Sequence, residues 1–292
     1  MGEKREIDIR ESVRVATDNE FIMAKGLQDL SIKARKLLYI AISQCRRTDK
    51  GFYEYSLSIP EFASMMDIAT TNVYKEAYKI TAELTSAKIT IVPEGRKRFT
   101  HYPLTSICEY DDNSYLRIEL NPRMTDFLLA LKGSFTQPLL NDFLKMNSPY
   151  SMAIWHLFQR EMHSKKPFIS EVIQFDITLE ELRKVTGCQE KLKQLSEFKN
   201  RVLDKALREI RDNCGVDITY INLKKERTVI GFRFSAISQF HISEDKISQG
   251  VKDKTRLKML EMKSKKSELS SKEKQEYDYL VSHCKQMELD FD

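Results

Sequence analysis

SPYSMAIWHLFQREMHS, residues 148–164, opens a series of four segments that occurs twice in this chain. The segments that follow it are FDITLEEL (175–182), SEFKNRVLDKALREIRDN (196–213) and VDITYINL (216–223). The earlier copy consists of SIKARKLLYIAISQCRR (31–47), LSIPEF (57–62), TTNVYKEAYKITAEL (70–84) and KITIV (88–92). Ser31 lies 28 positions before Ile59, and Ser148 lies 29 positions before Ile177. A period of about 118 residues is too long for a solenoid, so the repeat predicts two related domains.

The order of the segments within each copy predicts the fold class. The apolar stripe of residues 31–47, beside Lys33, Arg35 and Lys36, is typical of an amphipathic helix. Leu57–Ile59 fits a short strand, and Pro60 fits the start of a helix with Ser58 as its cap. A third helix and two β-rich runs follow. Helix, strand, helix, helix and hairpin is the order of a winged helix, a DNA-binding variant of the helix-turn-helix. We therefore predict an α+β chain of two tandem winged-helix domains related by an internal repeat.

The composition limits the class of protein. The 292 residues suffice for two domains, and 41% hydrophobic residues suffice for two packed cores. No apolar run approaches the roughly 18 to 20 residues of a membrane span. The first ten residues hold no apolar run, and position 6 is Glu, so we expect neither a secretory signal nor N-myristoylation. The sequence predicts a cytoplasmic protein without a membrane partner.

The cysteines fit the same compartment. The chain has five, and no two of them form a C-x-x-C pair. An odd number of scattered cysteines is typical of reduced thiols and not of a disulfide framework or a zinc site. They are Cys45, Cys108, Cys188, Cys214 and Cys284.

The net charge of +5 is confined to one part of the chain. Residues 244–292 carry 11 basic and 11 acidic side chains, so the whole excess lies in residues 1–243. A modest excess of this kind suits a protein with one basic face, and it does not suit a polycation.

We predict four segments along the chain. Residues 1–16 are charged and lack a period, which indicates a mobile N-terminal arm. Residues 17–132 form the first winged-helix domain, and residues 133–240 form the second. The connection near residues 132–149 contains Leu139, Leu140, Phe143 and Leu144, which favours a packed helix over a loose linker. Residues 241–292 are a charged C-terminal tail, helical or disordered.

The third helix of the second domain is predicted to contact DNA. Five apolar side chains spaced at about 100° per residue fall on one side of it. They are Leu195, Phe198, Val202, Ala206 and Ile210. Asn200 on the opposite side suits adenine, and Arg201 suits guanine. The helix start favours phosphate, where Lys191 and Lys193 lie. The predicted DNA-contacting residues of this segment are Lys191, Lys193, Lys199, Asn200, Arg201 and Arg208.

Three further groups are predicted to contact DNA. In the first domain Asn72, Lys75 and Lys79 lie opposite the apolar face of Val73, Ala77, Ile80 and Leu84. Two basic hairpin tips fit wings that lie along the DNA backbone. They contain Arg96, Lys97 and Arg98 in the first domain and Lys224, Lys225 and Arg227 in the second. Any amphipathic helix has a charged outer face, so one such helix alone indicates little. Two of them, each followed by a basic tip, favour DNA binding.

The chain resembles the iteron-binding plasmid replication initiators of the Rep family. The matching stretches are LSIKARKLLYIA (30–41), YSMAIWHLFQR (150–160), ITLEELRKV (177–185), FKNRVLDKALREI (198–210) and the β run 217–220. The resemblance covers roughly residues 17–238 and rests on the ordered set of segments. It implies tandem winged-helix domains whose monomers bind repeated origin sites, help open the duplex, and recruit the host initiator and the replicative helicase.

The same resemblance implies dimers that repress their own gene through the first domain as the dimer interface. By position, residues 191–208 would contact the major groove of a repeat, and the first domain would contact the adjoining groove. Two domains about one helical turn apart would cover a site of roughly 20 base pairs.

Enzyme functions are less well supported by the sequence. The five histidines contain no His-x-His pair of the kind that holds a metal in a nicking enzyme, and His156 and His163 are too far apart along a helix to share one metal. No glycine-rich nucleotide motif is present. The acidic run Glu109–Asp112 could hold Mg²⁺, but a turn between two strands explains it more simply. Trp155 lies in an apolar helix, which favours a place in the core.

These observations predict a non-enzymatic, sequence-specific binder of double-stranded DNA that initiates plasmid replication and needs no cofactor and no metal. Its partners would be origin repeats, its own operator, host replication proteins and a second copy of itself. Two alternatives stay open at this point. One is a winged-helix transcriptional repressor that binds a palindrome as a dimer. The other is a metal-dependent nicking enzyme centred on residues 109–112.

Overall fold

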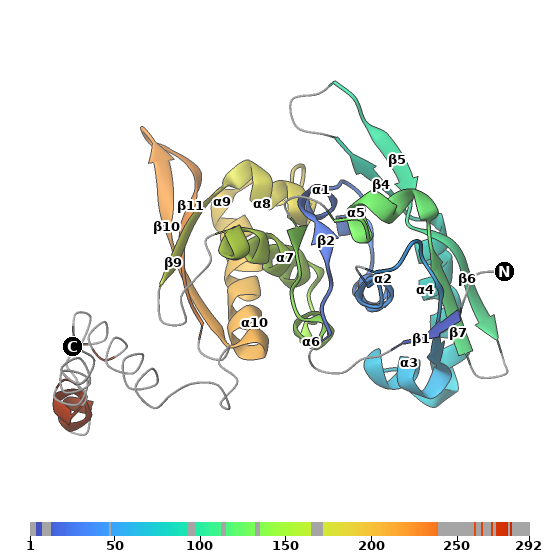
Figure 1. Ribbon diagram of the computed structural model, residues 1–292. Coiled ribbons are helices and arrows are strands. Elements are labelled where there is room, and N and C mark those ends of the chain that lie inside the picture. The colour runs from blue at the N-terminus through green and yellow to red at the C-terminus, as the bar shows by residue number, and fades with distance from the viewer. Residues whose placement is uncertain are drawn as a thin grey trace.

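The computed structural model describes residues 4–7, 13–46, 48–92, 97–111, 115–131, 135–164 and 172–238, with residues 260, 264, 270, 273–279 and 281 of the C-terminal segment. Figure 1 shows two groups of helices and strands, with helices α2 and α7 between them. Each group contains one larger sheet with helices packed on it, and two-stranded sheets, β2-β8 and β4-β5, complete the described part of the chain. The arrangement confirms the prediction of an α+β chain with two winged-helix domains.

The first group is built on a four-stranded sheet of order β1-β3-β7-β6. Its strands are β1 (Lys4–Glu6), β3 (Glu54–Ser58), β6 (Thr105–Asp111) and β7 (Tyr115–Leu120). Its longer helices are α2 (Ile32–Ser43), α3 (Ile59–Met65) and α4 (Val73–Ser86). The smaller elements are β2 (Thr17–Asp18), α1 (Asn19–Ile22), η1 (Leu27–Asp29), η2 (Thr70–Asn72), β4 (Lys88–Ile91), β5 (Thr100–Pro103), η3 (Pro122–Met124) and α5 (Thr125–Leu128).

The second group is built on a three-stranded sheet of order β10-β11-β9. Its strands are β9 (Ile173–Thr178), β10 (Val216–Lys225) and β11 (Thr228–Ser238). Its helices are α7 (Pro149–Ser164), α8 (Leu179–Thr186), α9 (Leu195–Phe198), the π turn η4 (Lys199–Leu203) and α10 (Asp204–Cys214). The connection between the groups holds β8 (Phe135–Thr136) and α6 (Leu140–Lys145), which confirms a packed helix there. The boundary between residues 132 and 133 stays a prediction.

The same local signal starts the second helix of both domains. Ser58 accepts a hydrogen bond from the backbone N–H of Glu61, whose carboxylate returns to Ser58. Thr178 and Glu181 form the same capping box at the start of α8. A cap of this kind is worth about 1 kcal/mol, because it satisfies backbone donors that the first helical turn leaves unpaired. The cap predicted at Ser58 is confirmed.

The hairpins differ between the two copies. In the second domain β10, the strand after the third helix, pairs with β11, which pairs with β9. In the first domain the strands in the same topological places are β6 and β7, because β7 pairs with both β3 and β6. The β4–β5 pair, which flanks the predicted basic tip, is an additional hairpin that lies between α4 and β6 in the sequence. Pairings between distant strands decide this difference, and the local pattern of residues 88–92 does not contain them.

The N-terminal residues differ from the predicted mobile arm. Strand β1 pairs in parallel with β3. Arg5 donates two hydrogen bonds to the carboxylate of Asp49, at 2.7 and 2.8 Å, and its guanidinium lies 3.9 Å from the centroid of the Tyr53 ring. Val15 is fully buried. Long-range partners order these residues, although their own sequence has no periodic pattern.

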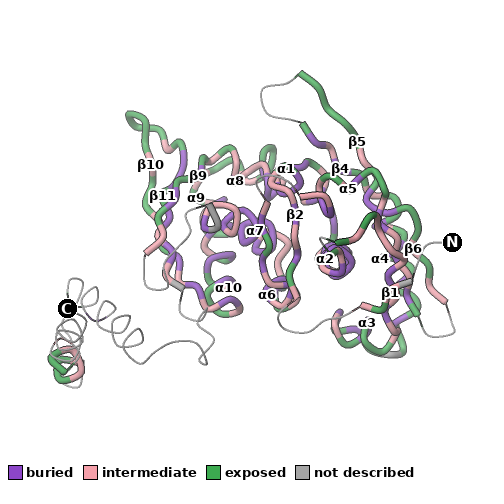
Figure 2. The backbone as a smooth tube through the Cα atoms, in the orientation of Figure 1, coloured by how far each residue is buried: buried purple, intermediate pink, exposed green. Residues whose placement is uncertain are grey.

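Helix α2 forms as predicted, but it is buried on almost every side, although its sequence pattern has a polar face. Residues 34 to 42 are all buried, including Arg35 and Lys36. Arg35 donates to the backbone oxygens of Pro149, at 2.8 Å, and Leu27. Figure 2 shows the burial of α2 and α7 against the exposed ends of the hairpins. The second half of the chain covers the polar side of α2, so its basic residues find partners inside the protein.

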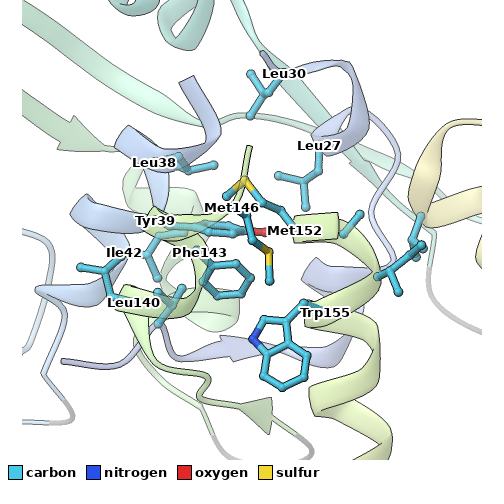
Figure 3. Close-up of a cluster of buried hydrophobic side chains, with 14 of the residues drawn as sticks. Leu27, Leu30, Leu38, Tyr39, Ile42, Leu140, Phe143, Met146, Met152 and Trp155 are labelled. Atoms are coloured by element: carbon cyan, nitrogen blue, oxygen red, sulfur yellow. The ribbon is translucent and has the colours of Figure 1, made fainter. Parts of the chain in front are cut away.

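One continuous core joins the two domains (Figure 3). The rings of Tyr39 from α2 and Phe143 from α6 lie 4.6 Å apart. Trp155 of α7 is fully buried, as predicted, and its indole N–H donates to Asp142 at 3.2 Å. Buried residues from both halves of the chain contribute to this core.

Candidate nucleic-acid interface

The third helix of the second domain, called the recognition helix below, is helical from Leu195 to Cys214. It consists of α9, the π-helical turn η4 and α10. Its inner face is buried against the second-domain core, through Phe198, Val202, Leu203, Ala206, Leu207 and Ile210. The helix begins at Leu195. Residues 188–194 form a loop in front of it, so Lys191 and Lys193 precede the helix start as expected.

The outer face of this helix carries the residues predicted to contact bases. Asn200, Arg201 and Arg208 are all exposed. Arg201 forms an ion pair with Glu197 one turn earlier, at 3.1 Å. The Nε of Arg208 donates to the backbone oxygen of Asp204 at 3.3 Å. The N-terminal part of the face is hollowed and open to solvent, and the hollow is lined by Lys193, Gln194, Ser196, Glu197, Asn200 and Arg201.

Arg183 of helix α8 organises the loop before the recognition helix. Its guanidinium donates to the backbone oxygens of four loop residues at 2.8 to 3.1 Å. These are Cys188, Lys191, Leu192 and Lys193. The same guanidinium lies 4.7 Å from the ring centroid of Phe198. Arginine suits this task because its planar fork serves several acceptors at once.

The loop geometry explains why Arg183 is needed. Leu192 has a φ of 51°, in the left-handed region that costs a side-chain-bearing residue about 1 kcal/mol or more. The hydrogen bonds from Arg183 to neighbouring carbonyls hold that conformation and leave Lys191 and Lys193 exposed. Sequence reasoning missed Arg183, because an arginine on a helix gives no local sign of the carbonyls it will contact.

Lys199 does not lie on the free face of the helix. Its ammonium lies 5.0 Å from the ring centroid of Tyr220 on β10 and 3.5 Å from the side-chain oxygen of Asn222. Tyr220 donates to the carboxylate of Asp204 at 2.7 Å, and burial, with this bond, raises the pKa of Tyr220. These contacts fix the helix against the hairpin. Lys199 therefore lies where the helix meets the hairpin, and its contact with DNA stays a prediction.

The second-domain wing, defined as the β10–β11 hairpin, ends in the predicted basic tip. Lys224, Lys225 and Arg227 are exposed, and Glu226 makes the turn with a φ of 57°. A β-bulge between Leu223 and Lys224 shifts the pairing just before the tip. Bulges increase local twist and redirect side chains, which places three cations at the free end of the wing.

In the first domain, helix α4 exposes the predicted residues Asn72, Lys75 and Lys79. The ammonium of Lys79 lies 3.1 Å from Glu76, which also pairs with Lys33 of α2 at 3.2 Å. That carboxylate reduces the positive charge of the α4 face. Each of the two helices therefore carries a carboxylate beside a predicted DNA-contacting cation, Glu76 on α4 and Glu197 on the second-domain helix.

The predicted basic tip of the first domain belongs to the additional β4–β5 hairpin. Lys97 and Arg98 are exposed just before β5, and Arg96 lies outside the described residues. The topological wing, β6–β7, instead carries Glu109 and Asp111 on strand β6. Both carboxylates pair with Arg117, at 3.1 and 2.9 Å. The predicted acidic turn is thus partly strand and charge-paired, and Asp112 lies outside the described residues.

The described residues contain no cluster of three or more His, Cys, Asp or Glu placed to hold a metal ion. His156 is buried, and its ring nitrogens lie 2.9 Å from the Thr17 hydroxyl and 3.1 Å from the Tyr39 hydroxyl. Cys45, Cys108, Cys188 and Cys214 are free thiols. No helix in the described part of the chain is long and apolar enough to cross a membrane.

Comparison with known proteins decides the family. The family model described as "Initiator Replication protein, WH1" matches residues 14–159, half of the chain. A second model, "Initiator Rep protein, WH2", matches residues 178–236. The chain belongs to the initiator replication protein family. The resemblance stated from the sequence is confirmed, and so is the pair of winged-helix domains.

A solved structure agrees with this fold. It is described as "Crystal structure of Pi initiator protein in complex with iteron DNA". The match has a TM-score of 0.67 and 18% sequence identity, and it covers 80% of this chain and 100% of that one. At this identity the likeness concerns the fold of the initiator protein. The individual DNA-contacting residues named above remain predictions for this chain.

Proposed function

We propose that this initiator replication protein binds repeated double-stranded DNA sites, or iterons, at a plasmid origin and so initiates replication. The observation that carries the proposal is the second-domain surface. There an exposed helix face with Asn200 and Arg201 adjoins a basic wing, and both belong to a winged helix. The Pi initiator protein, which has a similar fold, is described in complex with iteron DNA, and this supports the proposal.

The residues divide by their chemistry into two roles. Asn200 and Arg201 contact base edges in the major groove, since their side chains match adenine and guanine. Lys191, Lys193, Lys224, Lys225 and Arg227 contact phosphates, which fix the position of the protein and add affinity on any sequence. Asn72, Lys75 and Lys79 of the first domain contact the adjoining groove. The rigid core between the domains then sets the spacing of the two contacts.

The protein acts by positioning and distorting DNA, without an enzymatic step of its own. Bending and opening a duplex costs several kcal/mol, so several copies bound at adjacent repeats share that cost. We propose that the assembled copies recruit the host initiator and the replicative helicase. We also propose that dimers bind the protein's own operator and repress its gene.

Binding at several salt concentrations tests the proposal. The probes are duplexes from the DNA flanking the gene, one with direct repeats beside an AT-rich segment and one with a palindrome. We expect tight binding to the direct repeats and about tenfold or greater loss between 50 and 200 mM salt. Preference for one palindrome would identify a repressor instead. Weak binding that is equal on all sequences would contradict the proposal, and nicking of supercoiled DNA with Mg²⁺ would contradict the non-enzymatic role.

A further inference from the structure

The additional β4–β5 hairpin exposes an apolar pair beside basic residues. Phe99 is 63% exposed, and Val92 is 47% exposed. His101, also exposed, stacks at 5.1 Å from Phe99 and lies 2.8 Å from the hydroxyl of Thr90 across the hairpin. Single exposed apolar side chains are common on protein surfaces, so it is the basic residues beside this pair that indicate a partner. The sequence predicts DNA-backbone contacts for the basic tip of this hairpin, but it assigns no role to Phe99 or Val92.

The described part of the hairpin is held against the first domain. Ile89 and Ile91 are buried on the opposite face of the ribbon. Lys25 and Thr90 exchange two backbone hydrogen bonds, at 3.0 and 2.7 Å. On the other strand, the side chain of Asn121 donates to the backbone oxygen of Pro103 at 2.9 Å. These hydrogen bonds anchor both described strands of the hairpin to the first domain.

The charge of the hairpin indicates the chemistry of its partner. The described stretches 88–92 and 97–103 contain Lys88, Lys97 and Arg98 and no Asp or Glu. In Figure 1 the hairpin extends beyond the other elements on the side to which the end of the β10–β11 wing also points. A cationic ribbon with an exposed aromatic side chain complements DNA, where cations meet phosphates and an apolar side chain can enter between bases.

We propose that the β4–β5 hairpin binds the minor groove and that Phe99, flanked by Val92, is a wedge that partly unstacks one base step. Lys97 and Arg98 neutralise the phosphates on either side. The wedge bends the duplex toward the major groove and prepares it for opening. This inference rests on the proposed function, because it needs a protein that binds duplex DNA, but it adds a second contact of different chemistry.

The test uses the full-length protein with an intact repeat duplex and with a series of bulged duplexes. Each bulged duplex carries a one-base bulge at a different base step. Because a bulged step is already partly unstacked, the protein spends less free energy on unstacking it. Wild-type protein is expected to prefer the best bulged duplex by about tenfold or more, because unstacking a step costs a few kcal/mol. Phe99→Ala is expected to lose that preference, and Phe99→Leu is expected to keep most of it, since leucine also serves as a wedge.

A spectroscopic measurement separates a wedge from a general defect. 2-Aminopurine placed at the preferred step is expected to brighten on binding wild-type protein and to stay quenched with Phe99→Ala. Tyr279→Ala is the matched control, because Tyr279 is an aromatic residue of similar exposure, 61%, in the C-terminal segment 273–279. It is expected to behave like wild type.

The outcomes distinguish this inference from the proposed function. If Phe99→Ala keeps specific binding, the preference for the bulge and the fluorescence rise, the wedge is overturned while the proposed function stands. Loss of the rise in the Tyr279→Ala control as well would also overturn it, because the effect would then not be local to the hairpin. If wild-type protein shows no specific duplex binding at all, the proposed function itself fails.

Discussion

Arg201 is the side chain on which base specificity is expected to depend most. It lies exposed at the hollow of the recognition helix, with Glu197 as its partner in the free protein. Arg201→Ala is expected to weaken binding to the cognate repeat by about 1 to 3 kcal/mol, the usual worth of a bidentate contact with guanine. An exposed ion pair contributes little to folding, so the melting temperature should barely change.

The matching measurement is the ratio of dissociation constants for a cognate and a scrambled duplex. Arg211→Ala serves as the control, because Arg211 is exposed near the end of the same helix and pairs with Asp212 at 3.2 Å. It should leave the ratio unchanged. An Arg201→Ala protein with the wild-type ratio would remove Arg201 from the specificity residues.

Arg183 acts one step behind the interface, by shaping the loop that carries Lys191 and Lys193. Arg183→Ala removes the donors to four carbonyls and is expected to cost about 1 to 3 kcal/mol of stability. It should also weaken specific binding, with faster amide hydrogen exchange confined to residues 188–194. Arg183→Lys should restore little, because one ammonium cannot serve four acceptors in a plane. Full rescue by lysine would mean that only the charge matters.

At the scale of single elements, the β10–β11 wing has a role that salt can measure. Each phosphate contact contributes about one unit to the slope of log affinity against log salt. Replacing Lys224 and Lys225 together by Ala should therefore flatten the slope by about 2 and lower affinity on every sequence alike. A loss confined to the cognate repeat would show that these lysines contact bases and not phosphates.

Local signals predicted the elements well, and long-range pairing limited the rest. The cap at Ser58 and the apolar face of the recognition helix follow from neighbouring residues, and the structure confirms both. The strand pairing of β1, the burial of Arg35 and the identity of the β6–β7 wing depend on residues far away in the sequence. Arg183 was missed for the same reason, because its partners lie in the loop 188–194 and not on its own helix.

At the scale of the whole molecule, a buried polar cluster joins segments that are far apart in the sequence. His156 of α7 contacts Thr17 and Tyr39 from the first half of the chain. Burial lowers the pKa of His156 to about 3, with the nearby Arg35 adding to the effect. The histidine is therefore neutral in the folded protein near neutral pH. Because the unfolded chain binds this proton more readily, the free energy of unfolding depends on pH.

The sign of that linkage follows from proton binding. Below about pH 6.5 the unfolded chain protonates His156, whereas the folded protein does so only near pH 3. Stability should therefore fall as the pH falls through this range, by roughly 1 kcal/mol for each pH unit between 6 and 4. Denaturant unfolding of wild type and His156→Gln at each pH isolates the effect, because other groups titrate in both proteins. Parallel pH profiles would contradict it.

The central claim is that one molecule uses two winged-helix domains, held rigidly together, to contact adjoining grooves of a repeat. The most direct test is a hydroxyl-radical footprint of the full-length protein on a duplex with a single repeat, at a concentration where one molecule binds. The account predicts two protected segments about one helical turn apart, within a site of roughly 20 base pairs. A single protected segment beneath the second domain alone would contradict it.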